Sequence, residues 1–95
     1  MVRDSGVART TYLPETRTLK ELLRDLRVDA GLRQQDVGAA IGRSQSFVSE
    51  YETGQRRLDL VELRAVATEC GSTLRKLVDE FERRLAVPAR NRRRG

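Results

Sequence analysis

A chain of 95 residues with 38% hydrophobic content can build one modest core, so we expect a single domain. It has no His and a single Cys, which excludes a tetrahedral zinc site, a disulfide framework and a Cys-His or Ser-His nucleophile. The net charge of +5 comes mostly from Arg residues in the last eight positions, so the basic character is concentrated in a tail. Such a tail either follows phosphates or is only a solvated end.

No stretch approaches the roughly 20 apolar residues of a membrane span, and the N-terminal residues lack the apolar segment of a signal peptide. We therefore expect a cytoplasmic protein that contacts no membrane. A nucleophile, a base and an orienting group cannot be assembled from this sequence, so we expect no enzyme activity, no metal and no cofactor.

Composition divides the chain into three parts. Residues 1–16 mix Gly, Ser, Thr and Arg without apolar periodicity, which predicts a flexible N-terminal arm. Residues 17–87 carry helical patterns throughout and are predicted to form the domain. Residues 88–95 are an Arg-rich tail that we expect to be disordered.

The first predicted helix begins at Thr18, because Thr18-x-x-Glu21 has the form of a capping box. Apolar residues follow at helical spacing, namely Leu19, Leu22, Leu23, Leu26 and Ala30. Gly31 is expected to end this helix, since a residue without a Cβ adopts the left-handed conformation readily.

A second helix at 34–41 and a third at 45–52 are predicted to meet at Gly42 with hardly any linker. Ser44 is a good N-cap for the third helix. Gly38 is small where the second helix faces the third, so the two can cross closely. The residues predicted to fill the junction are Val37, Ile41, Val48 and Tyr51.

A fourth helix is predicted to begin at Asp59, three residues before Glu62, and a fifth after Ser72 or Thr73. The buried side of the fourth is predicted to use Leu60, Leu63, Val66, Ala67 and Cys70, with the Cys as a structural thiol. The apolar residues of the fifth are Leu74, Leu77, Val78, Phe81 and Leu85. Five helices with short connections predict an all-α fold, a compact five-helix bundle.

The second and third helices together have the form of a DNA-binding helix-turn-helix. Projection at 100° per residue places four polar residues of the third helix on one face: Gln45, Ser46, Ser49 and Glu50. Gln can bond adenine, Ser several base edges, and Glu the amino group of cytosine, so this face can read the major groove. The alternative is an ordinary solvated surface, with Ser49 and Glu50 bonded within the protein.

Residues 19–85 resemble the lambda-repressor-like (Cro/C1 or Xre) class of helix-turn-helix domains. The matching features are Leu32-x-Gln34, Gly42, Ser44-Gln45-Ser46, Tyr51-Glu52-Thr53-Gly54 and Arg56-Arg57-Leu58-Asp59. The resemblance implies that Gln34 bonds a phosphate and braces Gln45, and that the polar face of the third helix reads bases. The residues expected to contact the DNA backbone are Arg33, Gln34, Arg43, Ser44, Thr53, Arg56 and Arg57.

We therefore expect a sequence-specific transcriptional regulator, a repressor, that binds double-stranded DNA as a homodimer with the helix Ser44–Glu52 in the major groove. An antitoxin that autoregulates its operon is the alternative, with the N-terminal arm or the tail as its only candidate toxin-binding segments. A protein-interaction domain that has lost DNA binding is a third reading. For the dimer we expect contact through the fifth helix, where Phe81 and Leu85 would form an exposed patch, or else through the loop 55–58.

Overall fold

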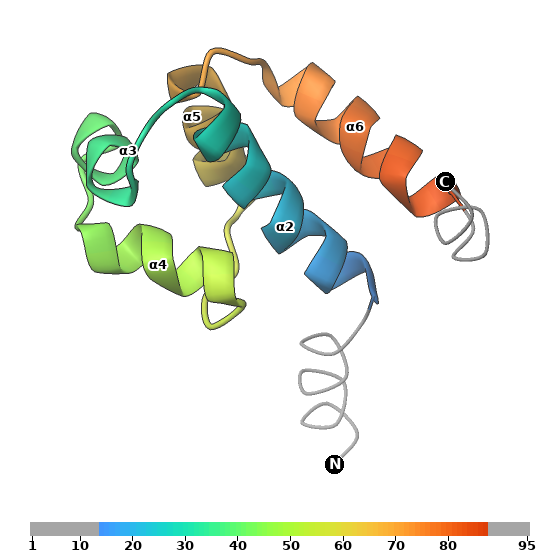
Figure 1. Cartoon of the computed structure of the whole chain (residues 1–95), viewed down its shortest axis with the longest axis horizontal. Helices are drawn as coiled ribbons and strands as arrows, with labels where there is room; N and C mark the ends of the chain where they lie inside the picture. The colour runs from blue at the N-terminus through green and yellow to red at the C-terminus, as the bar shows by residue number, and fades with distance from the viewer. Residues whose placement is uncertain (1–13, 88–95) are drawn as a thin grey trace.

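The computed structural model describes residues 14–87, and this part of the chain forms five α-helices without a strand. The helices are α2 (Pro14–Asp29), α3 (Gln34–Ala40), α4 (Gln45–Thr53), α5 (Leu60–Glu69) and α6 (Leu74–Ala86). In Figure 1, α2 runs through the centre of the bundle, with α3 and α4 on one side of it and α6 on the other. The expected all-α five-helix fold is confirmed.

The core is built from aliphatic side chains of all five helices, with two aromatic rings contributed by α4. Its buried members are Leu22, Leu23, Val37, Phe47, Val48, Tyr51, Val66, Ala67, Cys70 and Leu77. Full burial of each larger apolar side chain contributes roughly 1.5–3 kcal/mol, so this cluster is the main favourable term in folding. Cys70 is buried as predicted, and its burial raises the pKa of the thiol, which keeps it in the unreactive protonated form.

Three of the predicted helix starts are confirmed by their hydrogen bonds. The Ser44 hydroxyl accepts from the backbone N–H of Phe47 at 3.2 Å, which caps α4. At the start of α5, Asp59 and Glu62 each accept from the other's backbone N–H, at 2.7 and 2.8 Å. Thr73 caps α6 in the same way as Ser44 caps α4. Short polar side chains therefore set where these helices begin.

The predicted start of the first helix is wrong. Helix α2 begins at Pro14, and Thr18 lies inside it rather than at its N-cap. Proline fits the first turn of a helix because an N–H group there would have no acceptor within the helix. The negative charge of Glu15, the next residue, interacts favourably with the positive end of the helix dipole. Residues 14–16, which we assigned to the arm, are therefore helical. Residues 1–13 and the predicted tail at 88–95 lie outside the described residues.

Some apolar side chains do not lie where the periodicity places them. Leu60, predicted to be buried, is 62% exposed, because it begins α5 at the rim of the core, and Val61 next to it is 77% exposed. Val78 of α6 is also exposed. Phe81 packs against the core, which contradicts its expected place in an exposed patch, whereas Leu85 stays exposed.

The turn between α3 and α4 depends on two glycines for different reasons. Gly42 has φ +74°, a left-handed conformation that other residues adopt only with strain. Gly38 is buried in α3, and a Cβ there would lie 2.8 Å from the carbonyl oxygen of Ser44. The backbone of the turn therefore approaches α3 as closely as the sequence predicts. Within residues 14–87, no helix has both the length and the apolar composition needed to cross a membrane.

Candidate nucleic-acid interface

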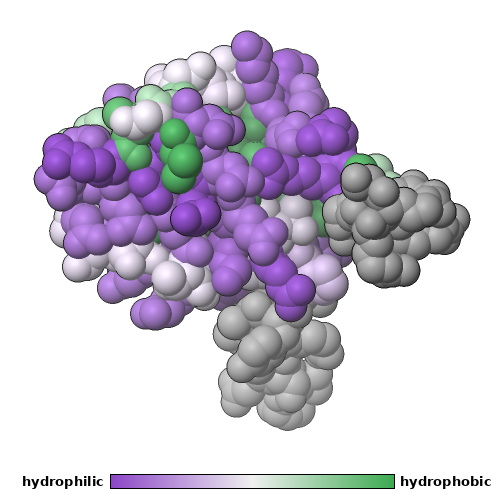
Figure 2. Space-filling model, viewed as in Figure 1, coloured by the Kyte–Doolittle hydropathy of each residue, from purple (hydrophilic) through white to green (hydrophobic). Residues whose placement is uncertain are grey.

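The polar face of α4 is present as predicted. Gln45 and Ser46 are exposed and Ser49 and Glu50 are partly exposed, while Val48 on the other side of the helix is completely buried. In Figure 2 the surface at the position of α4 is hydrophilic to neutral, with no continuous hydrophobic patch. The structure thus brings the four predicted base-reading residues together on one accessible face.

Gln45 does not stand free on this face, because it is hydrogen-bonded to α3. Its side-chain Nε2 donates to Oε1 of Gln34 at 2.7 Å, and Nε2 of Gln34 donates to Oε1 of Glu52 at 2.9 Å. An ionised carboxylate only accepts, so Glu52 determines which end of the Gln34 amide faces Gln45. The brace between Gln34 and Gln45 that the family resemblance implied is therefore part of the structure. The other N–H and the carbonyl oxygen of the Gln45 amide stay available.

The inner end of this chain of bonds is a buried ion pair that the sequence analysis missed. Nε of Arg27 donates to Oε2 of Glu52 at 2.7 Å, and a second guanidinium nitrogen donates to Oε1 at 3.0 Å. A third nitrogen donates to the carbonyl oxygen of Leu32 at 2.9 Å. The two charged side chains are only 12% and 3% exposed, and the hydrogen bonds to Glu52 raise the pKa of Arg27. Helices α2, α3 and α4 are therefore joined through one carboxylate.

Tyr51 and Phe47 form the apolar side of the same helix. Their rings meet edge to face with centroids 5.8 Å apart. The Tyr51 hydroxyl is buried without a hydrogen-bond partner in the described chain, and burial raises its pKa. Phe47 is only 5% exposed, so it belongs to the core rather than to the polar face of α4.

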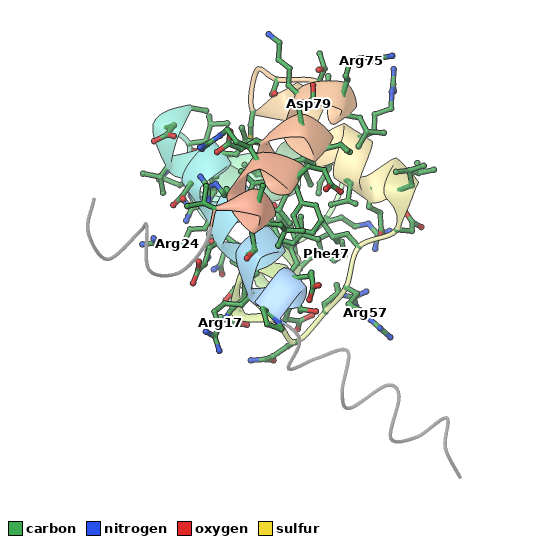
Figure 3. All side chains as sticks on the ribbon, turned by 90° about the vertical axis from the view of Figure 1, so that its right-hand side faces the viewer. Arg17, Arg24, Phe47, Arg57, Arg75 and Asp79 are labelled. Atoms are coloured by element: carbon green, nitrogen blue, oxygen red, sulfur yellow. The ribbon has the colours of Figure 1, made fainter. Side chains whose placement is uncertain are left out.

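The basic residues around α4 differ in how they are held. Arg43 pairs with Glu62 at 3.4 Å, and Arg56 pairs with Glu50 at 3.3 Å. Arg57 is exposed, and Figure 3 shows its side chain standing away from the ribbon after α4. All three lie near the two ends of α4, where phosphates flanking a major groove would be contacted.

Three further residues predicted to contact the DNA backbone form side-chain hydrogen bonds to other groups of the protein, namely Arg33, Ser44 and Thr53. The exposed guanidinium of Arg33 pairs with Asp36, whose carboxylate also accepts the backbone N–H of Arg33 and has its pKa lowered by these bonds. The Thr53 hydroxyl donates to the carbonyl oxygen of Ser49 at 3.0 Å. As in Ser44, the hydroxyl oxygen of Thr53 retains capacity for a second hydrogen bond. In residues 14–87 no group of His, Cys, Asp and Glu side chains is suited to hold a metal.

Comparison with known proteins identifies this arrangement. Residues 19–81 match the family described as helix-turn-helix domain. An XRE-family-like protein from Pseudomonas syringae pv. tomato is 33% identical, with a TM-score of 0.71 over 80% of this chain and 93% of that one. The clp gene regulator ClgR from Corynebacterium glutamicum shares the fold, with 23% identity and a TM-score of 0.70 over 78% of this chain and 79% of that one. No curated protein sequence gives a significant match.

The family match covers α3, the turn at Gly42 and α4, which are the elements that place the polar face described above. Two helices joined in this way are the standard unit for placing a helix in the major groove of DNA. The chain therefore belongs to the helix-turn-helix domain family and carries a DNA-binding domain of the XRE type.

Proposed function

We propose that this protein is a sequence-specific transcription regulator, a repressor, that inserts α4 into the major groove of double-stranded DNA. The observation that carries the proposal is the hydrogen-bonded chain from Arg27 through Glu52 and Gln34 to Gln45. These bonds hold the side-chain amide of Gln45, the proposed base-reading group, in one position on the surface of the protein without DNA. Support of an exposed side chain by hydrogen bonds to a buried ion pair is typical of a binding site and is not needed on a solvated surface.

Base reading is assigned to the exposed polar face of α4. Gln45 would bond the N6 and N7 edge of adenine with its free amide groups, and Ser46 and Ser49 would bond neighbouring base edges. Contacts to the DNA backbone are assigned to Gln34, Arg33, Arg43, Ser44, Thr53, Arg56 and Arg57. These contacts would position the domain without carrying sequence information.

One such domain reads few base pairs, so we propose a homodimer on two half-sites about one helical turn apart. The large apolar side chains most exposed in residues 14–87 are Val61 and Leu60, which follow the loop after α4. This favours dimer contact near the loop 55–58 over contact through Phe81 of α6. A repressor of this kind would act by occupying promoter DNA, which lies in the cytoplasm of a bacterial cell.

The test is selection of binding sites from random duplex DNA, followed by affinity measurements on the selected site. We expect an inverted repeat with half-sites about one turn apart; a single half-site would contradict the dimer.

Gln45→Ala should lose about 1–3 kcal/mol on the selected site and little on random DNA. Arg57→Ala, the matched control, should weaken both alike and reduce the salt dependence by about one charge. An equal loss on both DNAs for Gln45→Ala would contradict its reading role.

A further inference from the structure

A cluster of charged and aromatic side chains lies beside the polar face of α4. The guanidinium carbons of Arg43 and Arg56 lie 4.7 and 4.8 Å from the centroid of the Phe47 ring. Cations at this distance are attracted to the negative face of an aromatic ring. The ring thus holds two arginines, one from each end of α4, close to the surface that would meet DNA.

Arg56 is held to Glu50 by backbone as well as by side chain. The carbonyl oxygen of Glu50 accepts the backbone N–H groups of Gln55 and Arg56, at 2.8 and 3.2 Å, so the loop folds back onto this residue. Nε of Arg56 then donates to Oε1 of Glu50 at 3.3 Å. Both side chains are nearly half exposed, and both line an open hollow at the end of α4.

The pairing leaves one oxygen of the Glu50 carboxylate free. Oε2 accepts no hydrogen bond from residues 14–87. Glu50 lies four positions after Ser46, one turn along the same face of α4. An acceptor is therefore presented to the groove next to the other reading residues, while its charge is balanced from the side by Arg56.

The chemistry of the bases decides what such an acceptor would select. In the major groove guanine presents two acceptors, thymine presents an acceptor and a methyl group, and adenine presents a donor beside an acceptor. A carboxylate is repelled by each acceptor. Cytosine presents only the N4 amino donor, so it is the base whose edge matches a carboxylate without repulsion.

We propose that Glu50 is a specificity-determining residue that selects cytosine at one position of each half-site, and that Arg56 is a positioning residue for it. This inference rests on the proposed function. Arg56, held by Phe47 and Glu50, keeps the carboxylate in place and offsets its repulsion by the DNA phosphates. Without that cation, the carboxylate would weaken binding to every sequence.

The experiment compares selected sites for the wild type, Glu50→Gln and the control Glu82→Gln. Glu82 lies exposed on α6, so its variant makes the same change of charge away from α4. We expect one cytosine per half-site for the wild type and for Glu82→Gln. For Glu50→Gln the preference at that position should move to adenine, which an amide can bond through two groups, by about tenfold or more in the ratio of the two affinities.

Arg56→Ala separates positioning from phosphate contact. If Arg56 positions Glu50, this variant lowers the cytosine-to-adenine affinity ratio as well as overall affinity. The double variant with Glu50→Gln should then have the same cytosine-to-adenine ratio as Glu50→Gln alone. An unchanged ratio in the single variant would overturn the role of Arg56. A site that keeps its cytosine in Glu50→Gln would overturn the role of Glu50, while failure of every protein to enrich any sequence would overturn the proposed function itself.

Discussion

Helices α4 and α6 both carry a polar face, but the two faces are connected to the protein in different ways. On α4, hydrogen bonds join side chains 11, 18 and 25 positions apart and end on a buried ion pair. On α6, Glu80 pairs with Arg83 and Arg84 of its own next turn, and only Arg84 also reaches another helix, at Asp25. A polar side chain that is hydrogen-bonded to a buried ion pair is held in one position, whereas the exposed pairs on α6 constrain only neighbouring turns of the same helix. The difference supports the proposed assignment of DNA reading to α4.

The largest expected effect comes from breaking the buried ion pair between Arg27 and Glu52. Glu52→Gln leaves the guanidinium of Arg27 buried opposite a neutral partner, and breaking a buried ion pair costs about 3–5 kcal/mol. Urea unfolding should therefore show a large loss of stability, and Glu80→Gln on α6 should show almost none. Replacing both Arg27 and Glu52 by Met should recover most of the loss, since a matched apolar pair leaves no unpaired charge. A loss for Glu52→Gln as small as that for Glu80→Gln would show that water reaches the pair.

A smaller effect is expected at the junction that sets the crossing of α3 and α4. Gly38→Ala places a methyl group 2.8 Å from a backbone carbonyl oxygen that has no flexible side chain to yield, so the turn must shift. We expect a loss of about 1–3 kcal/mol in thermal unfolding, together with weaker binding to the selected site. Gly42→Ala is the matched control, because a methyl group there meets open space and adds only the strain of a positive φ, about 1–2 kcal/mol. Full DNA binding by a folded Gly38→Ala protein would mean that the crossing tolerates displacement.

The smallest expected effect concerns the pH dependence of the α6 pairs. Hydrogen bonds from Arg83 and then Arg84 lower the pKa of Glu80 to about 2. A lowered pKa in the folded state stabilises the protein above the ordinary pKa of glutamate, and this contribution is lost as the pH falls towards 2. Since these side chains are partly exposed, solvent screening keeps the contribution small. An NMR titration of the Glu80 carboxyl group should show its midpoint well below 4, and replacing both arginines by Gln should raise it.

Local signals predicted most of the fold and the outer layer of the site. Ser44, Asp59 and Thr73 mark helix starts because a short polar side chain caps the backbone wherever it stands, and Gly42 marks a turn that needs a positive φ. The start at Pro14 was missed because Thr18 offers an equally good local signal.

The buried ion pair behind the polar face could not be predicted from such local signals. Arg27 and Glu52 look like surface charges in the sequence, and nothing local states that two residues 25 positions apart meet in the core. Leu60 was misassigned because periodicity gives the face of a helix but not where the core ends along it. Both errors concern long-range packing, which local patterns do not contain.

The hydrogen-bonded chain behind Gln45 also bears on how such a protein changes its target over evolutionary time. The frame that holds α4 uses Gln45, Gln34 and the ion pair, whereas the hydroxyl groups of Ser46 and Ser49 make no hydrogen bond to residues 14–87. Under the proposed function, Gln45 belongs both to this frame and to the reading face, whereas Ser46 and Ser49 belong to the reading face alone. Single substitutions at the two serines would then change the preferred DNA sequence and leave the frame intact.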